Sequence, residues 1–558
     1  MLVCLIVLHL VPAHAAGTAA IASAHPLATE AGFEILRAGG NAFDAAVAVA
    51  AALAVVEPYG SGLGGGGFFL LHRAQDGFEV MLDARETAPG KATTDMYLDR
   101  KGAVIPGKSL QGPLAAGIPG TPAALAELAN RYGRLPLSRS LAPAIRYARE
   151  GFEVSEHYCE AIRMRLELLR GYPQTAAIFL RENAAPSPGY RLRQPELAGT
   201  LEEIAADGAA GFYRGKTARR LLDAVRAGGG IWRARDLEDY RVLERAPLRG
   251  EYRGMRITTA PPPSSGGVVL LTTLNILGNF ELSRLPEPQH VHLIVEAMRR
   301  AYRDRAEYLG DPDFVKLPLE KLLHPFYAAG LAASIRLDRA TPSAALPGAP
   351  VEAAGNDTTH FSIIDDMGNR VGATLSINFA FGSGFVATGT GVLLNNEMDD
   401  FAAAPGVPNG YGLIAGADNP NRIEPGKRML SSMTPAFLEQ DGRVAVLGTP
   451  GGSRIISMVL LSALAFHEGA AADRMTELPR FHHQFIPDHI LYEATAFTPP
   501  IEQALRAFGH PLVPSLHPYG NMQVVILDTA KNILTSASDP RGEGLARVAI
   551  GSDKPLSR

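Results

Sequence analysis

A threonine in mid-chain could supply a nucleophile. Thr358 stands where a loop of small residues, 347–357, meets a strand-like run of aromatic and β-branched residues at 361–364. If its hydroxyl attacks the carbonyl of Asp357 and water cleaves the resulting ester, Thr358 becomes a chain start with a free amine. Such an amine has a pKa of about 8 and is partly neutral at neutral pH, so it can act as the base for its own hydroxyl. Taken alone, Thr358 and Thr359 fit surface threonines on a hairpin better.

Other residue groups could complete a site, although each has an ordinary explanation. Gly451 and Gly452 precede a helix expected over 454–466, where N–H groups at a positive helix end could stabilise an oxyanion. A glycine-rich helix cap explains the same two residues equally well. Read alone, the acidic run 397–400 is a solvated turn, and Arg85 beside its acidic neighbour is a surface ion pair.

The elements that must position these residues alternate between helix and strand. Helices are expected over residues 27–38, 42–56 and 289–309. The second is apolar on nearly all faces and should be buried, whereas the third is amphipathic with mixed charges on its outer face. The run that begins at Thr358 and a second run over 371–381 are separated by a turn and predict a β-hairpin.

The bulk composition is that of a soluble globular protein of roughly two to four domains. The chain has 558 residues, of which 46% are hydrophobic and 20% charged, and its net charge of −4 gives no electrostatic basis for binding nucleic acid. Cys4 and Cys159 are its two cysteines and cannot form a disulfide framework or a cysteine metal site. The glycine run 62–67 precedes a strand instead of following one, which argues against a dinucleotide fingerprint. No cofactor and no metal is expected.

Residues 1–15 are similar to a short signal peptide. They are apolar from Leu2 to Val11 apart from His9, and an Ala-x-Ala cleavage site ends at Ala15. The segment lacks the usual basic residues, which makes it atypical and is compatible with a truncated start. A frayed apolar tail of a cytoplasmic protein is the alternative. We expect a periplasmic or secreted protein without a membrane span after the signal is removed.

Four longer motifs, in this order, resemble those of the γ-glutamyltranspeptidases, or glutathione hydrolases, of the N-terminal nucleophile hydrolase superfamily. They are Asn356-Asp357-Thr358-Thr359-His360-Phe361-Ser362, Leu393-Leu394-Asn395-Asn396-Glu397-Met398-Asp399-Asp400-Phe401, Leu430-Ser431-Ser432-Met433 and Pro450-Gly451-Gly452-Ser453-Arg454. The resemblance extends from about Ala22 to about Pro540 and so covers nearly the whole chain.

This resemblance implies an α/β fold built as a four-layer αββα sandwich, with two packed sheets between outer helices. It also implies that a precursor cleaves itself between Asp357 and Thr358. The products would be a large subunit of residues 16–357 and a small subunit of residues 358–558, which stay together as a heterodimer forming one αββα unit.

The same resemblance implies a role for each site residue. Thr358 would be nucleophile and base, and Ser376, where most members carry Thr, would hydrogen-bond to it. Gly451 and Gly452 would form the oxyanion hole, and Tyr411 would gate a lid loop over 405–412. A substrate α-ammonium would be held by Glu397, Asp400 and Asn378, and its α-carboxylate by Arg85, Ser431 and Ser432.

The implied reaction transfers a γ-glutamyl group from glutathione or a related compound to the threonine, and then to water, an amino acid or a peptide. A glutaryl-cephalosporin acylase of the same fold is the alternative, although its substrate lacks the α-amine that the acidic residues would bind. A less favoured alternative is an uncut, inactive protein that binds γ-glutamyl compounds.

Overall fold

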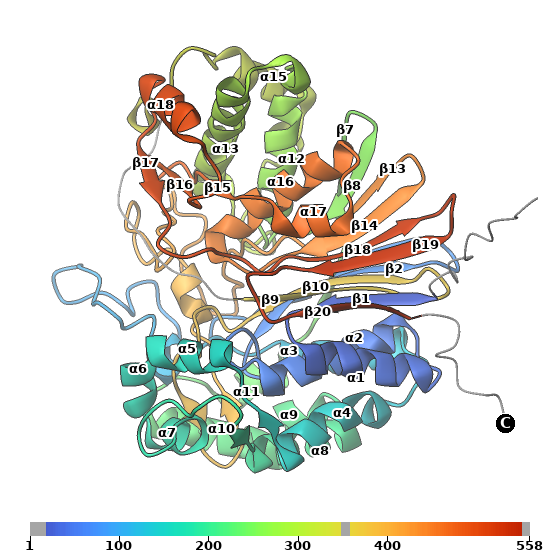
Figure 1. Cartoon of the computed structure of the whole chain (residues 1–558). Helices are drawn as coiled ribbons and strands as arrows, with labels where there is room; N and C mark the ends of the chain where they lie inside the picture. Colours follow the sequence, from blue (N-terminus) through green and yellow to red (C-terminus); the bar gives the residue numbers. More distant parts are fainter. Residues whose placement is uncertain (1–17, 347–357, 550–558) are drawn as a thin grey trace, which may run out of the picture.

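The computed structural model describes residues 18–346 and 358–549. Two sheets lie face to face in the middle of the molecule, and helices cover the outer face of each sheet (Figure 1). One hydrophobic cluster joins the first sheet to the helices of the N-terminal half, and a second joins both sheets to helices from 266 onward. The expected four-layer αββα arrangement is therefore confirmed. The predicted signal peptide and Asp357 lie outside the described residues.

The first sheet has seven strands in the order β20-β1-β9-β10-β2-β3-β6, and every neighbouring pair is antiparallel. Their bounds are β1 Ala19–Ser23, β2 Gly66–Arg73, β3 Phe78–Ala84, β6 Leu243–Arg245, β9 Thr359–Ile364, β10 Arg370–Ser376 and β20 Leu545–Ala549. Strand β1, from the start of the chain, thus lies between β20 and β9, which both follow residue 357.

The second sheet has six strands in the order β19-β18-β14-β13-β8-β7, again antiparallel throughout. Their bounds are β7 Leu248–Tyr252, β8 Met255–Thr259, β13 Ala436–Gln440, β14 Arg443–Gly448, β18 Gln523–Asp528 and β19 Ile533–Ser538. A separate small sheet consists of β15 (Phe481–His482), β16 (Ile490–Tyr492) and β17 (Leu512–Pro514).

Helices before residue 240 cover the first sheet, and helices from residue 266 onward cover the other (Figure 1). The first group includes α1 Pro26–Arg37, α2 Ala42–Val56, α3 Thr121–Arg131, α4 Leu137–Glu150, α5 Glu156–Met164, α8 Pro195–Asp207, α10 Gly215–Ala227 and α11 Ala234–Glu238. The second group includes α12 Gly266–Leu277, α13 Glu287–Tyr308, α15 Pro325–Ala333, α16 Ile455–His467, α17 Ala472–Glu477 and α18 Pro499–Ala507. No helix in the described ranges is both long and apolar enough to cross a bilayer.

Helix α2 shows how local sequence and packing agree. Asn41 Oδ1 accepts hydrogen bonds from the Phe43 and Asp44 amides, and the Asp44 carboxylate accepts one from the Asn41 amide, so a capping box fixes where the helix begins. All of its fifteen residues are buried, as its uniformly apolar sequence predicts.

Helix α13 departs from expectation. It has nearly the predicted length, but the prediction of a charged outer face was wrong, because Glu296, Arg299 and Arg300 are all buried. The Glu296 carboxylate accepts hydrogen bonds from both arginines, at 3.1 Å from Arg299 Nε and 2.7 Å from Arg300 Nη1. Opposite charges at i+3 and i+4 satisfy one another here inside the molecule.

Candidate active site

The register of two adjacent strands places the candidate nucleophile. Strands β9 and β10 are antiparallel, and Thr359 pairs with Leu375. Thr358 and Ser376, one residue further along each strand, therefore meet at the same end of the hairpin. The two hydroxyl oxygens are 3.4 Å apart, and the Thr358 side chain is buried with 7% of the residue exposed.

A pocket at this end of the sheet gathers most of the predicted site. Its empty volume is about 270 Å³. The predicted residues that line it are Arg85, Thr358, Ser376, Asn378, Glu397, Asp400, Tyr411, Ser431, Ser432 and Gly452. These residues come from seven separate stretches of sequence, and the fold brings them together in one pocket. Their individual roles stay predictions.

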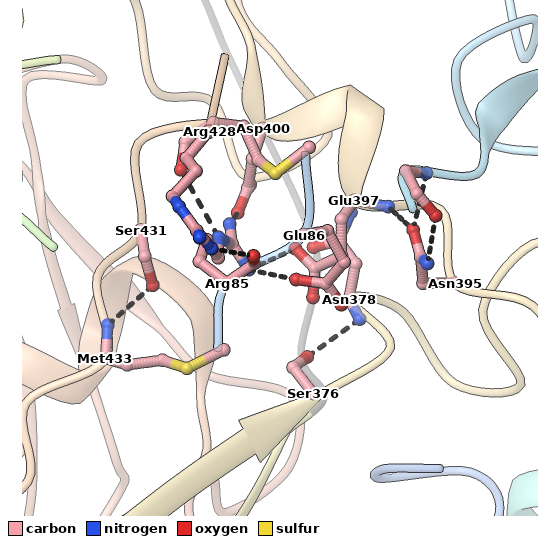
Figure 2. Close-up of polar contacts among 12 residues, drawn as sticks. Arg85, Glu86, Ser376, Asn378, Asn395, Glu397, Asp400, Arg428, Ser431 and Met433 are labelled. Carbon is pink, nitrogen blue, oxygen red and sulfur yellow. Dashed lines mark hydrogen bonds and ion pairs between the residues drawn. The ribbon is translucent and has the colours of Figure 1, made fainter. Parts of the chain in front are cut away.

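Arg85 lies at the centre of the charged part of the pocket (Figure 2). It follows β3 and is fully buried. Its Nη1 atom donates a hydrogen bond to Glu397 Oε2 at 2.6 Å and lies 3.6 Å from Glu86 Oε2, while its Nη2 atom contacts the carboxylate of Asp400. Arg85, predicted to hold a substrate α-carboxylate, therefore pairs directly with Glu397 and Asp400, predicted to hold its α-ammonium.

Three carboxyl groups around one guanidinium leave an excess of negative charge, and burial opposes that excess. Burial is the largest cause that raises the pKa of Glu397, to about 7, and Arg85 opposes the rise. Burial and the neighbouring Glu397 raise the pKa of Glu86 well above its ordinary value. The cluster consequently holds protons at neutral pH and can release them to solvent when a cation binds.

Arg428 supports this cluster and was not predicted from the sequence. Its guanidinium contacts the backbone oxygen of Arg85 (Figure 2). The Tyr240 hydroxyl donates a hydrogen bond to the same oxygen at 2.9 Å. The Arg428 Nη1 atom lies 3.3 Å from Asp83 Oδ1. Arg428 thereby fixes the main chain that carries Arg85. The basic pair Lys427-Arg428, one residue before the Leu430-Ser431-Ser432-Met433 motif, was the available signal.

The two serines of that motif are held in different ways. Ser431 Oγ accepts a hydrogen bond from the Met433 amide at 3.1 Å, which forms a local turn (Figure 2). Ser432 Oγ lies 3.4 Å from the guanidinium of Arg305, a buried arginine of α13. Both hydroxyls line the pocket beside Arg85, where they can donate to a carboxylate.

The expected strand over 371–381 is shorter in the structure. Strand β10 ends at Ser376, and Asn378 adopts a left-handed conformation with φ of 77°. The Asn378 amide nitrogen donates to Ser376 Oγ at 2.7 Å, so the turn begins with a side-chain contact (Figure 2). This early turn is what carries Asn378 into the pocket wall instead of along a strand.

Tyr411 covers one side of the pocket. Its hydroxyl donates to the Asn378 carbonyl at 2.8 Å, and its ring stacks on Phe379 with centroids 4.6 Å apart. Gln484 Nε2 donates to the Tyr411 carbonyl at 3.1 Å. These contacts hold the 405–412 loop against the site.

The two candidate oxyanion glycines stand at the start of a short 3-10 turn, Gly452–Arg454, that leads into α16. Both have positive φ, 139° for Gly451 and 56° for Gly452. A Cβ atom on Gly452 would lie 2.3 Å from the Tyr411 ring, so only glycine fits beneath it. Gly452 lines the pocket, whereas Gly451 is not among the lining residues described.

One cluster outside this pocket has the side chains of a metal site. His292, Glu296 and His510 have ligand atoms within 4.8 Å of one another. However, Glu296 is paired with two arginines, His292 Nδ1 is 2.7 Å from His510 Nε2, and His292 Nε2 is 2.7 Å from the Arg336 carbonyl. These contacts are those of a closed hydrogen-bond network.

Comparisons with known proteins give consistent results. The model of the γ-glutamyltranspeptidase family matches residues 28–549. The chain is 42% identical to the glutathione hydrolase proenzyme of Escherichia coli strain K12 over 527 residues, which cover 93% of this chain and 90% of that protein. It is 37% identical to the acylase ACY 1 proenzyme of Pseudomonas sp. strain V22, over 93% and 91% of the two chains.

A solved structure is similar over almost its full length. The cephalosporin acylase from Bacillus halodurans superposes with a TM-score of 0.83 at 29% sequence identity, covering 96% of each chain.

Proposed function

The chain belongs to the γ-glutamyltranspeptidase family, and from that premise we propose that it is a self-processed glutathione hydrolase that can also transfer the γ-glutamyl group to amines. The observation that carries the proposal is the single pocket that joins Thr358 to Arg85, Glu397 and Asp400. A hydroxyl nucleophile beside groups for both charges of an α-amino acid fits a γ-glutamyl substrate.

Maturation would be the first reaction of Thr358. Its Oγ attacks the Asp357 carbonyl carbon, the peptide C–N bond breaks, and the freed nitrogen takes a proton as an ester forms. Water then cleaves the ester and leaves a carboxylate on Asp357 and a hydroxyl on Thr358. The resulting chains would be residues up to 357 and residues from 358 onward.

Catalysis would repeat this chemistry on a bound amide. The new amine of Thr358 takes the proton of its own hydroxyl while Oγ attacks the γ-carbonyl carbon, and N–H groups at Gly451 and Gly452 stabilise the oxyanion. The amine then gives that proton to the leaving nitrogen, and a γ-glutamyl ester remains. Water or an acceptor amine attacks the ester, and Oγ leaves with a proton.

Substrate recognition would separate the ion pairs around Arg85. A substrate α-ammonium at Glu397 and Asp400, with Asn378 as a further acceptor, replaces the protons that the cluster holds. A substrate α-carboxylate then takes donors from Arg85 and from the hydroxyls of the Ser431-Ser432 pair. Each end of the zwitterion meets an opposite charge in a buried site, where such contacts are strong.

Replacement of the nucleophile tests this proposal. Thr358→Ala should give one uncut chain of about 59 kDa without activity, because both cleavage and acyl transfer need the hydroxyl. Thr359→Val is the matched control, since it preserves volume and removes a buried hydroxyl that has no hydrogen-bond partner among the described residues. It should be cut and active. Two subunits from Thr358→Ala, or one inactive band from the wild-type protein, would contradict the proposal.

A second candidate function is that of a glutaryl-cephalosporin acylase, which the similar acylase sequence and structure favour. The acidic pair Glu397 and Asp400 argues for a substrate with an α-ammonium, which a glutaryl group lacks. Turnover of γ-glutamyl-anilide compared with glutaryl-anilide decides between the two. We expect the γ-glutamyl compound to be preferred at least tenfold, and the reverse order would support the acylase.

We also propose export through the segment at 1–15, with the mature enzyme in the periplasm or outside the cell. Its apolar run and Ala-x-Ala ending support this. Mass spectrometry of the mature protein should find a large chain that starts at residue 16 and ends at residue 357. A large chain that retains residue 1 would contradict export by this segment.

A further inference from the structure

Arg305 is a buried arginine whose positive charge has no carboxylate partner among the described residues. It lies in the last turn of α13 and is 5% exposed. Arg85, Arg299 and Arg300 are buried to a similar extent, yet each of them contacts a carboxylate. Burial lowers the pKa of Arg305 to about 10, so the side chain is still charged at neutral pH. A buried cation without a counter-ion is costly, and an anion that binds nearby removes part of that cost.

The guanidinium of Arg305 contacts two serine hydroxyls. Its Nε atom donates a hydrogen bond to Ser265 Oγ at 2.9 Å, and its Nη2 atom donates to Ser432 Oγ at 3.4 Å. A guanidinium has donors and no acceptor, so both hydroxyls receive from it and keep their own protons for other acceptors.

The two hydroxyl protons serve different acceptors. Ser265 Oγ donates to the Ser431 carbonyl at 2.6 Å, and the Ser265 amide donates to the same carbonyl at 2.8 Å. The residue before α12 is thereby attached to the segment that carries both pocket serines. Ser432 Oγ, in contrast, donates to no acceptor among the described residues, and Ser432 lines the pocket that contains Thr358. Its proton is therefore available to a ligand in that pocket.

A carboxylate at the Ser432 hydroxyl would lie near two cations that differ in their surroundings. Arg85 lines the pocket, but Glu397 and Asp400 already contact its guanidinium. Arg305 stands behind Ser432 and is not among the described residues that line the pocket, so it acts on a ligand through that hydroxyl. Opposite charges joined through one hydroxyl attract strongly in a buried site, because little water screens them.

We propose that Arg305 is a positioning residue for the substrate α-carboxylate: it orients the Ser432 hydroxyl as a donor into the pocket, and it gains a counter-ion only when a ligand with a carboxylate binds. This inference rests on the proposed γ-glutamyl transfer. Two geometric facts carry it, namely burial of the guanidinium without a carboxylate partner and its contacts with two hydroxyls that can only accept from it. Arg305 therefore selects between donors, because a donor without the α-carboxylate gains nothing from its charge.

The test compares two donors that differ only in the α-carboxylate, γ-glutamyl-anilide and 4-aminobutanoyl-anilide. Wild-type enzyme should prefer the first by roughly a hundredfold in kcat/KM. Arg305→Met keeps a long unbranched side chain in the interior but removes the charge. It should lower this preference about tenfold, mainly by raising KM for γ-glutamyl-anilide. Arg305→Lys retains the charge without the fork of donors and should give an intermediate preference.

A double-mutant cycle separates a role through Ser432 from a merely structural one. When Ser432 is already replaced by alanine, Arg305→Met should lower the preference only about threefold, because the hydroxyl that Arg305 orients is gone. Arg303→Met is the matched control on the same helix. Arg303 pairs with Asp304 at 2.9 Å, away from the residues that line the pocket, and its replacement should change the preference less than about twofold.

The outcomes are distinguishable from those of the proposed function. If Arg305→Met is not cut into subunits, Arg305→Lys alone decides, and its preference must fall below that of wild-type enzyme. An unchanged preference in the Arg305 variants, or full additivity with Ser432→Ala, would overturn the role of Arg305. Failure of wild-type enzyme to cleave γ-glutamyl-anilide would instead overturn the proposed function.

Discussion

At the scale of single residues, the site depends on how one arginine and its carboxyl neighbours share charge. Arg85 is fully buried, and its guanidinium contacts Glu397, Asp400 and Glu86. The buried Glu397 has a pKa of about 7, so its charge changes within the range in which enzymes are assayed. A substrate ammonium binds best when this carboxyl group is ionised.

Donor binding should therefore depend on pH. With a pKa of about 7, the ionised fraction of Glu397 rises about tenfold between pH 6 and pH 8. We expect KM for a γ-glutamyl donor to fall by a similar factor over that range. Glu397→Gln should flatten the KM profile and leave the pH dependence of kcat, which follows the Thr358 amine. A pH-independent KM in wild-type enzyme would contradict this role for Glu397.

The hydroxyl of Ser376 should matter most during maturation. It lies 3.4 Å from Thr358 Oγ1 and accepts the Asn378 amide, so it can orient the attacking hydroxyl. A hydrogen bond of about 1 kcal/mol corresponds to a change of about fivefold in rate. Ser376→Ala should slow self-cleavage by about that factor in a time course on a denaturing gel. Ser376→Thr retains the hydroxyl and should be cut at least as fast as wild-type protein, and equal rates in all three proteins would exclude the role.

At the scale of elements, the end of strand β10 organises the pocket wall. Because β10 stops at Ser376 and the chain turns at Asn378, the next residue, Phe379, reaches the Tyr411 ring. The amide of Gly410 also donates to Asp399 Oδ2 at 2.7 Å, which adds a second attachment of the 405–412 loop. The loop is thus held by the same turn that forms the site.

Loosening this loop should favour hydrolysis over transfer. Tyr411→Phe keeps the ring on Phe379 and removes the hydrogen bond to the Asn378 carbonyl, a loss of about 1 kcal/mol. A loop that opens more often admits more water to the acyl-enzyme. We expect the ratio of hydrolysis to transfer to glycylglycine to rise about fivefold, measured by product analysis. A ratio unchanged in this variant would show that the loop does not control access of water.

At the scale of the whole molecule, buried histidines should set the limit of stability in acid. Burial lowers the pKa of His360 and His482 to about 3 and of His25 to about 4, from an ordinary value of 6.5. Folding therefore keeps these rings neutral. The stability that they contribute is complete above pH 6.5 and is lost as pH falls toward 3, because the unfolded chain binds protons that the folded one does not.

Thermal unfolding can measure this effect. Each pKa unit of difference corresponds to about 1.4 kcal/mol. The raised pKa values of Glu86, of Glu397 (about 7) and of Asp399 (about 6) offset part of the histidine contribution. His483 and His510, whose pKa values burial also lowers to about 3, add to that contribution. We expect Tm to fall steadily from pH 7 to pH 4, together with a net uptake of protons on unfolding at pH 5. A constant Tm over this range, or net release of protons, would contradict it.

How well the sequence predicted the structure also differs between residues, elements and the whole molecule. The motifs predicted which residues would meet, because Thr358, Glu397 and Gly452 each stand in a run specific enough to recognise. Helix α2 was predictable because capping and composition both point to burial. The four-layer arrangement followed from the resemblance and not from periodicity.

The features that escaped prediction depend on tertiary partners. The charges of α13 read as solvated, yet Glu296 and Arg300 satisfy each other in the interior. The left-handed Asn378 interrupts a run that reads as continuous strand. The role of Arg428 becomes visible only when the Arg85 carbonyl lies beside it. Sequence spacing carries no information about the long-range contact of Arg428 with Arg85, and it does not tell whether the i,i+4 pair of Glu296 and Arg300 lies in solvent or in the interior.

The position of strand β1 has a consequence for the mature enzyme. This strand precedes the proposed cut, yet it is hydrogen-bonded on one edge to β20 and on the other to β9, which both follow it. Strands of the two products of the cut would alternate in the first sheet, so neither product could dissociate without breaking the hydrogen bonds of that sheet. Exchange of subunits between enzyme molecules should then be as slow as denaturation. The two subunits of each heterodimer would therefore always derive from the same precursor polypeptide.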